Sequence, residues 1–328
     1  MNIPDPGNRT PLNRNFYIAA IFLSLLTGHA VFAQRRLPPP PPKINPTSDA
    51  LVFGDRTWVY YLAANSGSPR KLAHGNFPAL SPDKTRVAYC TPVDATRSGE
   101  SVSVMLFDLA SGKTSSVFQA NGYLNHLRWS TDGRRILFSA AYLNGKRELD
   151  FVSVDGAGKQ RVIGTGEQGV ADVFAPVWAP DGRSIYFQDM NDLIQAGVDG
   201  QIVTRLPLGP ITEEKESVTS ADSFVPSPVD ANLLVYTRSV PGSKLFEKSF
   251  GEPNTALFLY NLQTKTRKRL TSVDLLALDP VWSRDGAYIY FSGYHDREGR
   301  AASPFRIYRI NADGTGLLEI GPGENPGT

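Results

Sequence analysis

The chain has 328 residues, of which 41% are hydrophobic and 10% aromatic, and this composition is that of a folded protein rather than a disordered one. Its 34 basic and 32 acidic side chains nearly cancel to a net charge of +2, so no strong field favours nucleic acid or another charged polymer as a partner. The single cysteine, Cys90, excludes an intramolecular disulfide framework and any multi-cysteine metal site.

The first 33 residues have the layout of a secretory signal peptide. An apolar run covers residues 16–33, two arginines precede it, and Val31 and Ala33 are residues of the kind found before a cleavage site, here at Gln34. These features predict export to the periplasm or the medium, with no stable membrane span after cleavage. An uncleaved N-terminal anchor is the alternative, because the run is about as long as the shortest membrane helices.

Residues 34–44 follow the signal and are rich in proline. Five prolines stand in a row from Pro38 to Pro42. Proline has no amide donor and favours the polyproline II conformation, so such a run is stiff. This segment is therefore predicted to be a linker that leads into the folded part of the chain.

Residues 45–321 are built on an internal repeat. Its most regular copies read RWSTDGRRILF at 128–138, VWAPDGRSIYF at 177–187 and VWSRDGAYIYF at 281–291, and weaker copies begin near residues 45, 79 and 225. Each copy has an apolar run, a turn that contains Asp, Gly or Pro, and a second apolar run. Strand-forming residues on both sides of such a turn predict a β-hairpin.

A second predicted hairpin follows each copy, as in ELDFVSVDGAGKQRVI at 148–163 and FRIYRINADGTGLLEI at 305–320. Two hairpins make a four-stranded unit of the length of a propeller blade, and six units fit residues 45–321. The predicted fold is all-β, a six-bladed β-propeller of four-stranded antiparallel blades. Residues 322–328 are expected to form a C-terminal tail.

The hairpin pattern W-[SA]-x-D-G resembles the propeller repeat of the TolB family, with Trp129, Trp178 and Trp282 at one equivalent position. The resemblance covers nearly all of the chain after the signal. TolB proteins carry a separate α/β domain before the propeller, and only residues 34–44 precede it here, so that domain is expected to be absent. The resemblance implies an envelope protein as partner, such as a peptidoglycan-associated lipoprotein.

Propeller geometry places the loops that enter the inner strands on one face, which we call the loop face, and the Asp-Gly turns on the other. Two equivalent residues, His126 and Asp279, lie three positions before a repeat tryptophan, where the inner strand enters the channel. The full set of candidate partner- or ligand-binding residues at the channel mouth and on the loop face is Asn76, Asn125, His126, Asp222, Asp279 and His295. No cofactor is predicted, but imidazole and carboxylate groups there could bind a divalent cation.

Known enzyme signatures are missing from the sequence. It has no G-x-S-x-G elbow, H-E-x-x-H helix, Walker loop or Rossmann glycine fingerprint. The favoured hypothesis is an exported, non-catalytic propeller that binds a protein or peptide in the cell envelope. The alternative is a carbohydrate-active lyase or hydrolase, or a glycan-binding propeller, that uses a His/Asp cation site at the channel mouth.

Overall fold

The computed structural model describes residues 44–92, 101–213, 218–242, 254–295 and 305–328. The chain divides into a unit of residues 1–40 and a unit of residues 41–328, and every described residue belongs to the second. The predicted signal peptide, and all of the predicted linker except Ile44, therefore lie outside the described residues.

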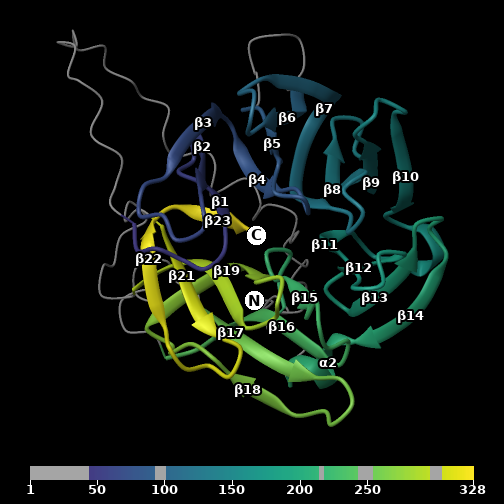
Figure 1. Ribbon diagram of the computed structural model, residues 1–328. Coiled ribbons are helices and arrows are strands. Elements are labelled where there is room, and N and C mark those ends of the chain that lie inside the picture. The colour runs from purple at the N-terminus through teal and green to yellow at the C-terminus, as the bar shows by residue number, and fades with distance from the viewer. Residues whose placement is uncertain (1–43, 93–100, 214–217, 243–253, 296–304) are drawn as a thin grey trace, which may run out of the picture. The chain divides into compact units, whose positions relative to one another are not determined.

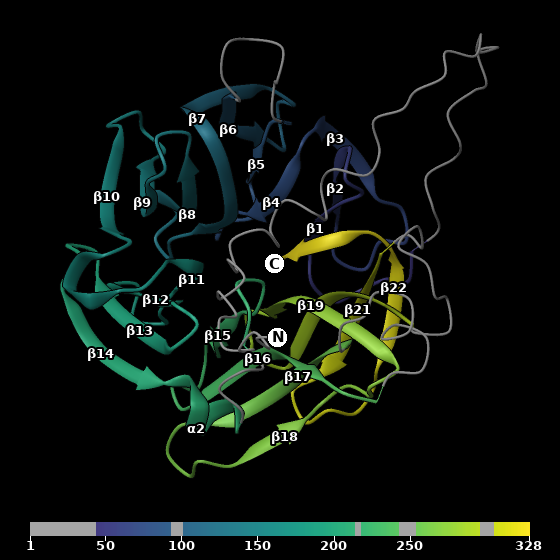
Figure 2. The same ribbon diagram turned by 180° about the vertical axis from the view of Figure 1, so that it is seen from behind.

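The strands of the second unit form six antiparallel four-stranded blades around a central axis, as Figures 1 and 2 show. From the axis outward, blade 1 consists of β23 (Glu324–Gly327), β1 (Leu51–Gly54), β2 (Trp58–Leu62) and β3 (Arg70–His74). Blade 2 consists of β4 (Asn76–Leu80), β5 (Arg86–Cys90), β6 (Ser101–Asp108) and the first half of β7 (Thr114–Trp129). Blade 3 consists of the second half of β7, β8 (Arg135–Tyr142), β9 (Arg147–Ser153) and β10 (Lys159–Gly164).

The other three blades follow in chain order. Blade 4 consists of β11 (Phe174–Trp178), β12 (Ser184–Gln188), β13 (Asp192–Gly197) and β14 (Ile202–Pro207). Blade 5 consists of β15 (Phe224–Pro226), β16 (Leu233–Val240), β17 (Asn254–Asn261) and β18 (Arg267–Arg269). Blade 6 consists of β19 (Leu275–Trp282), β20 (Tyr288–His295), β21 (Arg306–Asn311) and β22 (Leu318–Pro322). The predicted six-bladed propeller is confirmed.

One strand, β7, belongs to two blades and joins them into a seven-stranded sheet. Its residues 114–121 pair with β6, and its residues 122–129 pair with β8. The change of partner falls at Gly122, where φ is +141° and a Cβ would collide with the carbonyl oxygen of Ala141. Glycine tolerates both the positive φ and the close approach. It therefore lets one strand leave blade 2 and enter blade 3 without an intervening loop.

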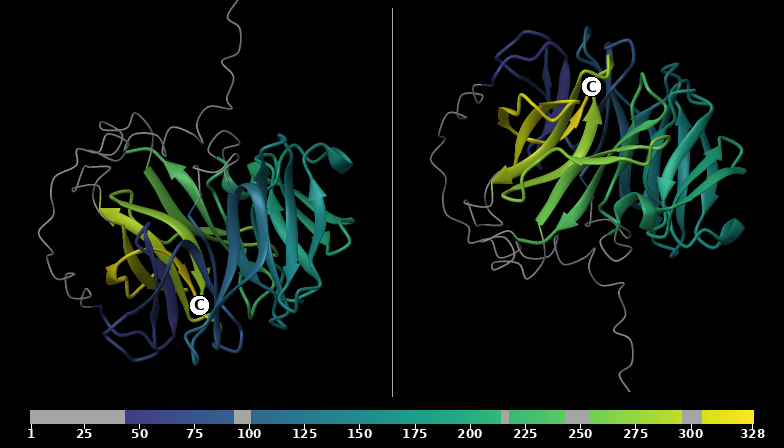
Figure 3. Two further views of the ribbon diagram at one scale, coloured as in Figure 1. Left: turned by 90° about the horizontal axis from the view of Figure 1, so that it is seen from above. Right: turned by 90° about the horizontal axis from the view of Figure 1, so that it is seen from below.

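The end of the chain closes the ring. Residues 322–328 are not the expected tail, because β23 pairs antiparallel with β1 and is the innermost strand of blade 1. In the side views of Figure 3, the C-terminal end lies beside the purple strands of blade 1. Without β23, the inner edge of β1 would present unpaired backbone groups to the channel. Blade 1 is thus built from both ends of the propeller sequence.

Helical structure among the described residues is limited to two short turns. A 3₁₀ turn, η2 (Glu167–Gly169), precedes blade 4, and a single α-helical turn, α2 (Leu208–Thr212), precedes blade 5. Buried Leu208 and Ile211 hold α2 against blade 5, where the Tyr236 hydroxyl donates to the Ile211 carbonyl at 3.1 Å. Within the described part of the chain, no helix has the length and apolar character to cross a membrane.

The S-x-D motif explains why the inner hairpins turn where they do. In three blades the serine hydroxyl donates to the aspartate two residues later at 2.6 Å, in the pairs Ser81–Asp83, Ser130–Asp132 and Ser283–Asp285. The same carboxylate oxygen accepts a backbone N–H two residues further on. These bonds lower the pKa of all three carboxyl groups and satisfy the turn locally, as Asx-turn chemistry does.

The repeat tryptophans lie between blades, as expected for core residues. Trp129, Trp178 and Trp282 are at most 9% exposed. Each indole N–H also donates to a backbone carbonyl of the preceding blade, at Ala79 (2.9 Å), Arg128 (3.1 Å) and Val225 (3.0 Å). Each tryptophan thus combines apolar packing with one polar contact across a blade interface.

Truncation of a repeat tryptophan tests this arrangement. We expect Trp178→Ala to lower the free energy of unfolding by about 3–5 kcal/mol, because it leaves a core cavity and removes the indole hydrogen bond. Val203→Ala, at a β14 side chain that is 64% exposed, serves as the control and should cost less than about 1 kcal/mol. Chemical denaturation measures both. A loss below about 1 kcal/mol for Trp178→Ala would contradict the inter-blade role.

Candidate binding site at the channel mouth

Five of the six described inner strands contain a bulge at one equivalent position. The register of β4, β7, β11, β19 and β23 with the next strand shifts there. The residue at each bulge has a left-handed backbone, with φ of 46–59°, at Phe77, His126, Ala175, Asp279 and Asn325. Bulges bend a strand and redirect a side chain. Here they place four of these five residues around one small cavity at the axis.

Proline follows the bulge residue in four of the strands. The pairs are Phe77-Pro78, Ala175-Pro176, Asp279-Pro280 and Asn325-Pro326. Proline lacks the N–H that an unbroken ladder needs, so a bulge is one of the few strand positions that accept it. The X-Pro pair is therefore a sequence signal for the bulge, and its occurrence at residues 325–326 marks the strand that closes the ring.

The cavity at the axis is narrow. It is lined by Phe77, Pro78, His126, Arg128, Asp279, Asn325 and Pro326. Only about 10 Å³ is open to the centre of a water molecule, which is room for about one water. A sugar ring or a peptide does not fit at this level of the channel, so a larger ligand would contact these residues from the mouth above them.

Arg128 sets the electrostatics of the cavity, together with the low local dielectric. Burial and, to a smaller extent, the nearby Arg128 charge together lower the pKa of His126 to about 3, so the imidazole is neutral at physiological pH. Burial raises the pKa of Asp279, while Arg128 and a hydrogen bond from Ser292 oppose that shift. Burial likewise lowers the pKa of Arg128, and Asp279 opposes this. Arg128 and Asp279 are thus opposite charges from blades 3 and 6.

A second pair of opposite charges stands at the rim. Arg56 Nε lies 3.3 Å from Glu324 Oε2, and the arginine side chain is 55% exposed whereas the glutamate is 17% exposed. Burial raises the pKa of Glu324, Arg56 lowers it, and the charges of Asp279 and Asp55 raise it again. Glu324 is therefore electrostatically linked to the channel cluster, while Arg56 faces solvent. We call Arg56, Arg128, Asp279, Glu324 and Asn325, with His126, the mouth cluster.

Four of the predicted site residues lie at or beside this cluster. His126 and Asp279 line the cavity. Asn76, at the start of β4, donates through its amide to the Arg56 carbonyl at 3.1 Å. Asn125 precedes His126 in β7, and Ser139 links the two, since its hydroxyl is 3.5 Å from both the Asn125 carbonyl and His126 Nδ1.

The other two predicted residues lie elsewhere. Asp222 is 2% exposed and accepts hydrogen bonds from Thr219 N (2.7 Å), Thr219 Oγ1 (3.1 Å) and Thr237 Oγ1 (2.9 Å). It therefore fixes the turn before β15, and burial raises its pKa to about 6. His295 ends β20 with its ring edge-on to Tyr308, the centroids 6.1 Å apart.

Arg56, Arg128, Glu324 and Asn325 were not predicted from the sequence. Their roles depend on neighbours that are distant in the sequence, and only Asn325 carries a local signal, the proline after it. Among the residues that the structure describes, no group of three or more His, Cys, Asp or Glu side chains is arranged to hold a metal ion.

No known protein family model matches the sequence. One curated relative, the uncharacterized peptidase YuxL of Bacillus subtilis, is 25% identical over 232 residues. The match covers 70% of this chain and 31% of YuxL, so the chain spans about a third of that relative's length.

Several solved structures share the fold. TolB from Acinetobacter baumannii superposes with a TM-score of 0.60 at 18% identity, over 85% of this chain and 65% of TolB. A putative TolB from Agrobacterium tumefaciens superposes with a TM-score of 0.55 at 15% identity, over 84% of this chain and 91% of that protein. A puromycin hydrolase superposes with a TM-score of 0.52 at 15% identity, over 85% of this chain and 44% of the hydrolase. These likenesses confirm the expected resemblance to the TolB propeller at the level of the fold.

The bulge can be tested at Ala175, which is 3% exposed. Ala175→Gly should change the free energy of unfolding by less than about 0.5 kcal/mol, because relief of the left-handed strain offsets the lost methyl group. Ala88→Gly, in the regular part of β5 at 0% exposure, should cost about 1–2 kcal/mol. Equal losses in the two variants, measured by chemical denaturation, would contradict a left-handed residue at position 175.

The lowered pKa of His126 predicts a pH dependence of stability. A folded-state pKa of about 3 lies below the ordinary value of 6.5, so the unfolded chain binds the proton first and stability is lost as the pH falls through that window. Between pH 7 and 4.5, the wild type should lose about 1–3 kcal/mol more than His126→Asn, since asparagine tolerates the same backbone. The same change at exposed His74 is the control. An identical pH profile in wild type and His126→Asn would contradict the prediction.

Proposed function

We propose that this protein is an exported, non-catalytic propeller that binds a protein or peptide of the cell envelope through its loop face and channel mouth. The observation that carries this proposal is the mouth cluster, in which charged and polar groups from several blades converge above a channel that admits about one water. Such a site can accept the end or a loop of a polypeptide, whose backbone and carboxylate groups pair with fixed polar side chains.

The charges of the mouth cluster suit recognition by shape and hydrogen bonding. Arg128 faces Asp279, and Arg56 pairs with Glu324, so the positive and negative groups are largely matched within the protein. Only Arg56 is mostly exposed. A partner that approaches from the loop face would meet this guanidinium first, and an acidic group on the partner would compete with Glu324 for it.

The resemblance to TolB supports the proposed class of partner and its compartment. We infer that the partner is an envelope lipoprotein of the peptidoglycan-associated type. The apolar run at residues 16–33 supports export, which places the propeller in the periplasm or outside the cell. The proposed class of partner and the proposed compartment both hold whether or not the propeller also works within a larger assembly.

Affinity capture with a matched pair of variants tests the proposal. The tagged chain from residue 34 onward is incubated with solubilised envelope, and bound proteins are identified by mass spectrometry. We expect one envelope lipoprotein to be enriched, and Arg56→Glu to reduce its recovery at least about tenfold, because the change repels an acidic partner and breaks the pair with Glu324. Lys265→Glu, in the exposed β17–β18 turn on the opposite face, should leave recovery unchanged.

A parallel capture in EDTA separates this proposal from a carbohydrate-active or glycan-binding site that uses a cation. Recovery that is insensitive to EDTA supports the docking function. Loss of recovery with EDTA, equal loss with both charge reversals, or no enriched protein would each overturn it. In those cases, the cation hypothesis would be tested next, by metal analysis and by His126→Ala.

A further inference from the structure

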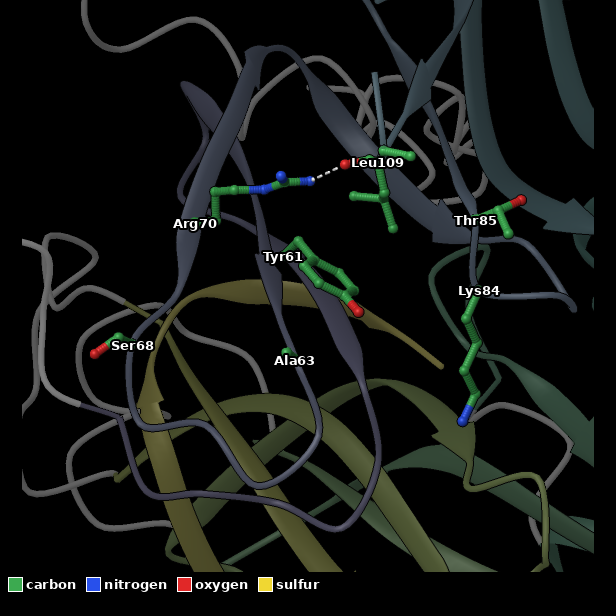
Figure 4. A pocket seen from close by; sticks show the side chains of 8 residues that line it. Tyr61, Ala63, Ser68, Arg70, Lys84, Thr85 and Leu109 are labelled. Atoms are coloured by element: carbon green, nitrogen blue, oxygen red, sulfur yellow. Dashed lines mark hydrogen bonds between the residues drawn. The ribbon is translucent and has the colours of Figure 1, made fainter. Parts of the chain in front are cut away.

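A cleft lies between blades 1 and 2 on the face opposite the channel mouth, shown in Figure 4. Its walls come from the β2–β3 turn with the flanking strand residues Tyr61 and Arg70, from the β4–β5 turn, and from the β6–β7 turn. The cavity volume is about 470 Å³. This lies within the range of cavities that hold small organic ligands. The cleft shares no residue with the mouth cluster.

Arg70 is held in place on one wall of the cleft. Its guanidinium carbon lies 5.8 Å from the centroids of both the Tyr61 and Phe107 rings, and one of its N–H groups donates to the Leu109 carbonyl at 3.0 Å. Figure 4 shows the side chain extended across the top of the cleft toward Leu109. Arginine has five N–H donors in a planar fork, so this single bond fixes the group and leaves donors for a ligand.

Lys84 supplies a second positive charge from the other wall. It is exposed in the β4–β5 turn, where its backbone is left-handed with φ of 59° and its N–H donates to the Ser81 carbonyl at 2.9 Å. The side chain lines the cleft at the edge away from Arg70, as Figure 4 shows. Among the described residues, neither Arg70 nor Lys84 forms an ion pair with a carboxylate.

The nearest acidic side chain to Lys84 in sequence is turned into its own loop. Asp83 accepts from the Ser81 hydroxyl at 2.6 Å and from the Thr85 N–H at 3.1 Å, and these bonds help to lower its pKa to about 2. It does not line the cleft. The lining groups that carry charge are thus both positive, and an anion that entered would find two unpaired cations.

The remaining lining residues supply an apolar surface and hydroxyl groups. Tyr61 stands in the middle of the cleft, with Ala63 and Leu109 around it, and Ser68 and Thr85 lie on the two sides. Ala110 also lines the cleft. An aromatic ring beside hydroxyl groups accommodates a compact organic body, while the Arg70 guanidinium can hold an oxyanion and Lys84 adds positive charge at the other edge. This combination differs from a bare basic patch, which has no surface for the rest of a ligand.

We propose that the cleft between blades 1 and 2 binds a small molecule that carries a carboxylate. Arg70 pairs with the carboxylate through its free N–H groups, Lys84 adds a second contact, and Tyr61 packs against the body of the ligand. This function is separate from partner binding at the mouth, because the two sites lie on opposite faces and use different residues.

Calorimetric titration of the chain from residue 34 onward tests this proposal. The probes are D-galacturonate as a sugar acid, succinate as an aliphatic diacid and D-galactose as the uncharged counterpart of the first. We expect at least one acid to bind with a dissociation constant of about 1 mM or tighter at low salt, and D-galactose to bind at least about tenfold more weakly. Affinity for the acid should fall as ionic strength rises. Whichever of the two acids binds identifies the kind of carboxylate that the cleft accepts.

Three variants locate the binding. Arg70→Gln should weaken binding of the acid at least about tenfold. Lys84→Gln lies at an exposed turn position where folding is little affected, and it should weaken this binding about three- to tenfold. Lys71→Gln is the matched control. Lys71 is the next residue of β3 and carries the same charge, but its ammonium lies 4.3 Å from the Trp58 ring centroid, outside the cleft. The affinity of the Lys71→Gln variant for the acid should stay within about twofold of that of the wild type.

Either of two results would overturn the proposal. One is that neither acid binds more tightly than about 10 mM at low salt. The other is that an acid binds and that Lys71→Gln weakens it as much as Arg70→Gln and Lys84→Gln do, since binding would then follow general surface charge. Thermal unfolding of each variant checks that the fold is intact, and Arg56→Glu should leave this binding unchanged.

Discussion

The architecture depends on a hydrogen bond that crosses from one blade to the next. A four-stranded blade has apolar side chains on both faces and is stable only when neighbours cover them. Trp129, Trp178 and Trp282 each fill such an interface and donate the indole N–H to a carbonyl of the preceding blade. At these three interfaces the buried ring and its hydrogen bond hold one blade against the next. The meeting of residues from different blades at the channel mouth depends on this packing.

The closing interface, between blades 6 and 1, lacks the repeat tryptophan and combines a buried apolar cluster, which includes Phe53 and Ile307, with polar contacts. Thr328 stands where blades 3, 4 and 6 have the repeat tryptophan, three residues after the bulge residue Asn325, and its hydroxyl donates to the Trp282 carbonyl at 2.9 Å. Arg284 of blade 6 donates to the carbonyls of Ser81, at 2.9 Å, and Pro82 in blade 2. Closure thus combines apolar packing between blades 1 and 6 with polar side chains that reach from blade 6 to blade 2 and from β23 to blade 6.

The parts of the fold that could be predicted from the sequence are those with local causes. The S-x-D turns, the alternation of the strands and the repeat tryptophans all act within one hairpin or between neighbouring hairpins, so they leave a pattern that repeats. The closure by β23 joins residues more than 260 positions apart, and its sequence ENPG is poor in strand formers. The proline after Asn325, which matches the proline after Phe77 and Asp279, is the local trace of it.

The candidate site shows the same division between local and long-range causes. His126 and Asp279 could be predicted because they occupy one position of the repeat. Asp222 also lies near the entrance of an inner strand, but Thr219 and Thr237 provide hydrogen-bond donors that draw its carboxylate into a turn. Position in a repeat gives the place of a side chain, whereas its direction depends on the donors around it.

The two faces of the propeller treat charge in different ways. At the mouth, Arg128 faces Asp279 and Arg56 pairs with Glu324, while His126 is neutral, so the field outside the cluster is small. Binding there would depend on contact geometry more than on long-range attraction. In the cleft, Arg70 and Lys84 have no described acidic partner, so attraction of an anion extends over about a Debye length. The ring makes both arrangements available because channel positions gather residues from several blades, whereas an inter-blade groove gathers them from only two.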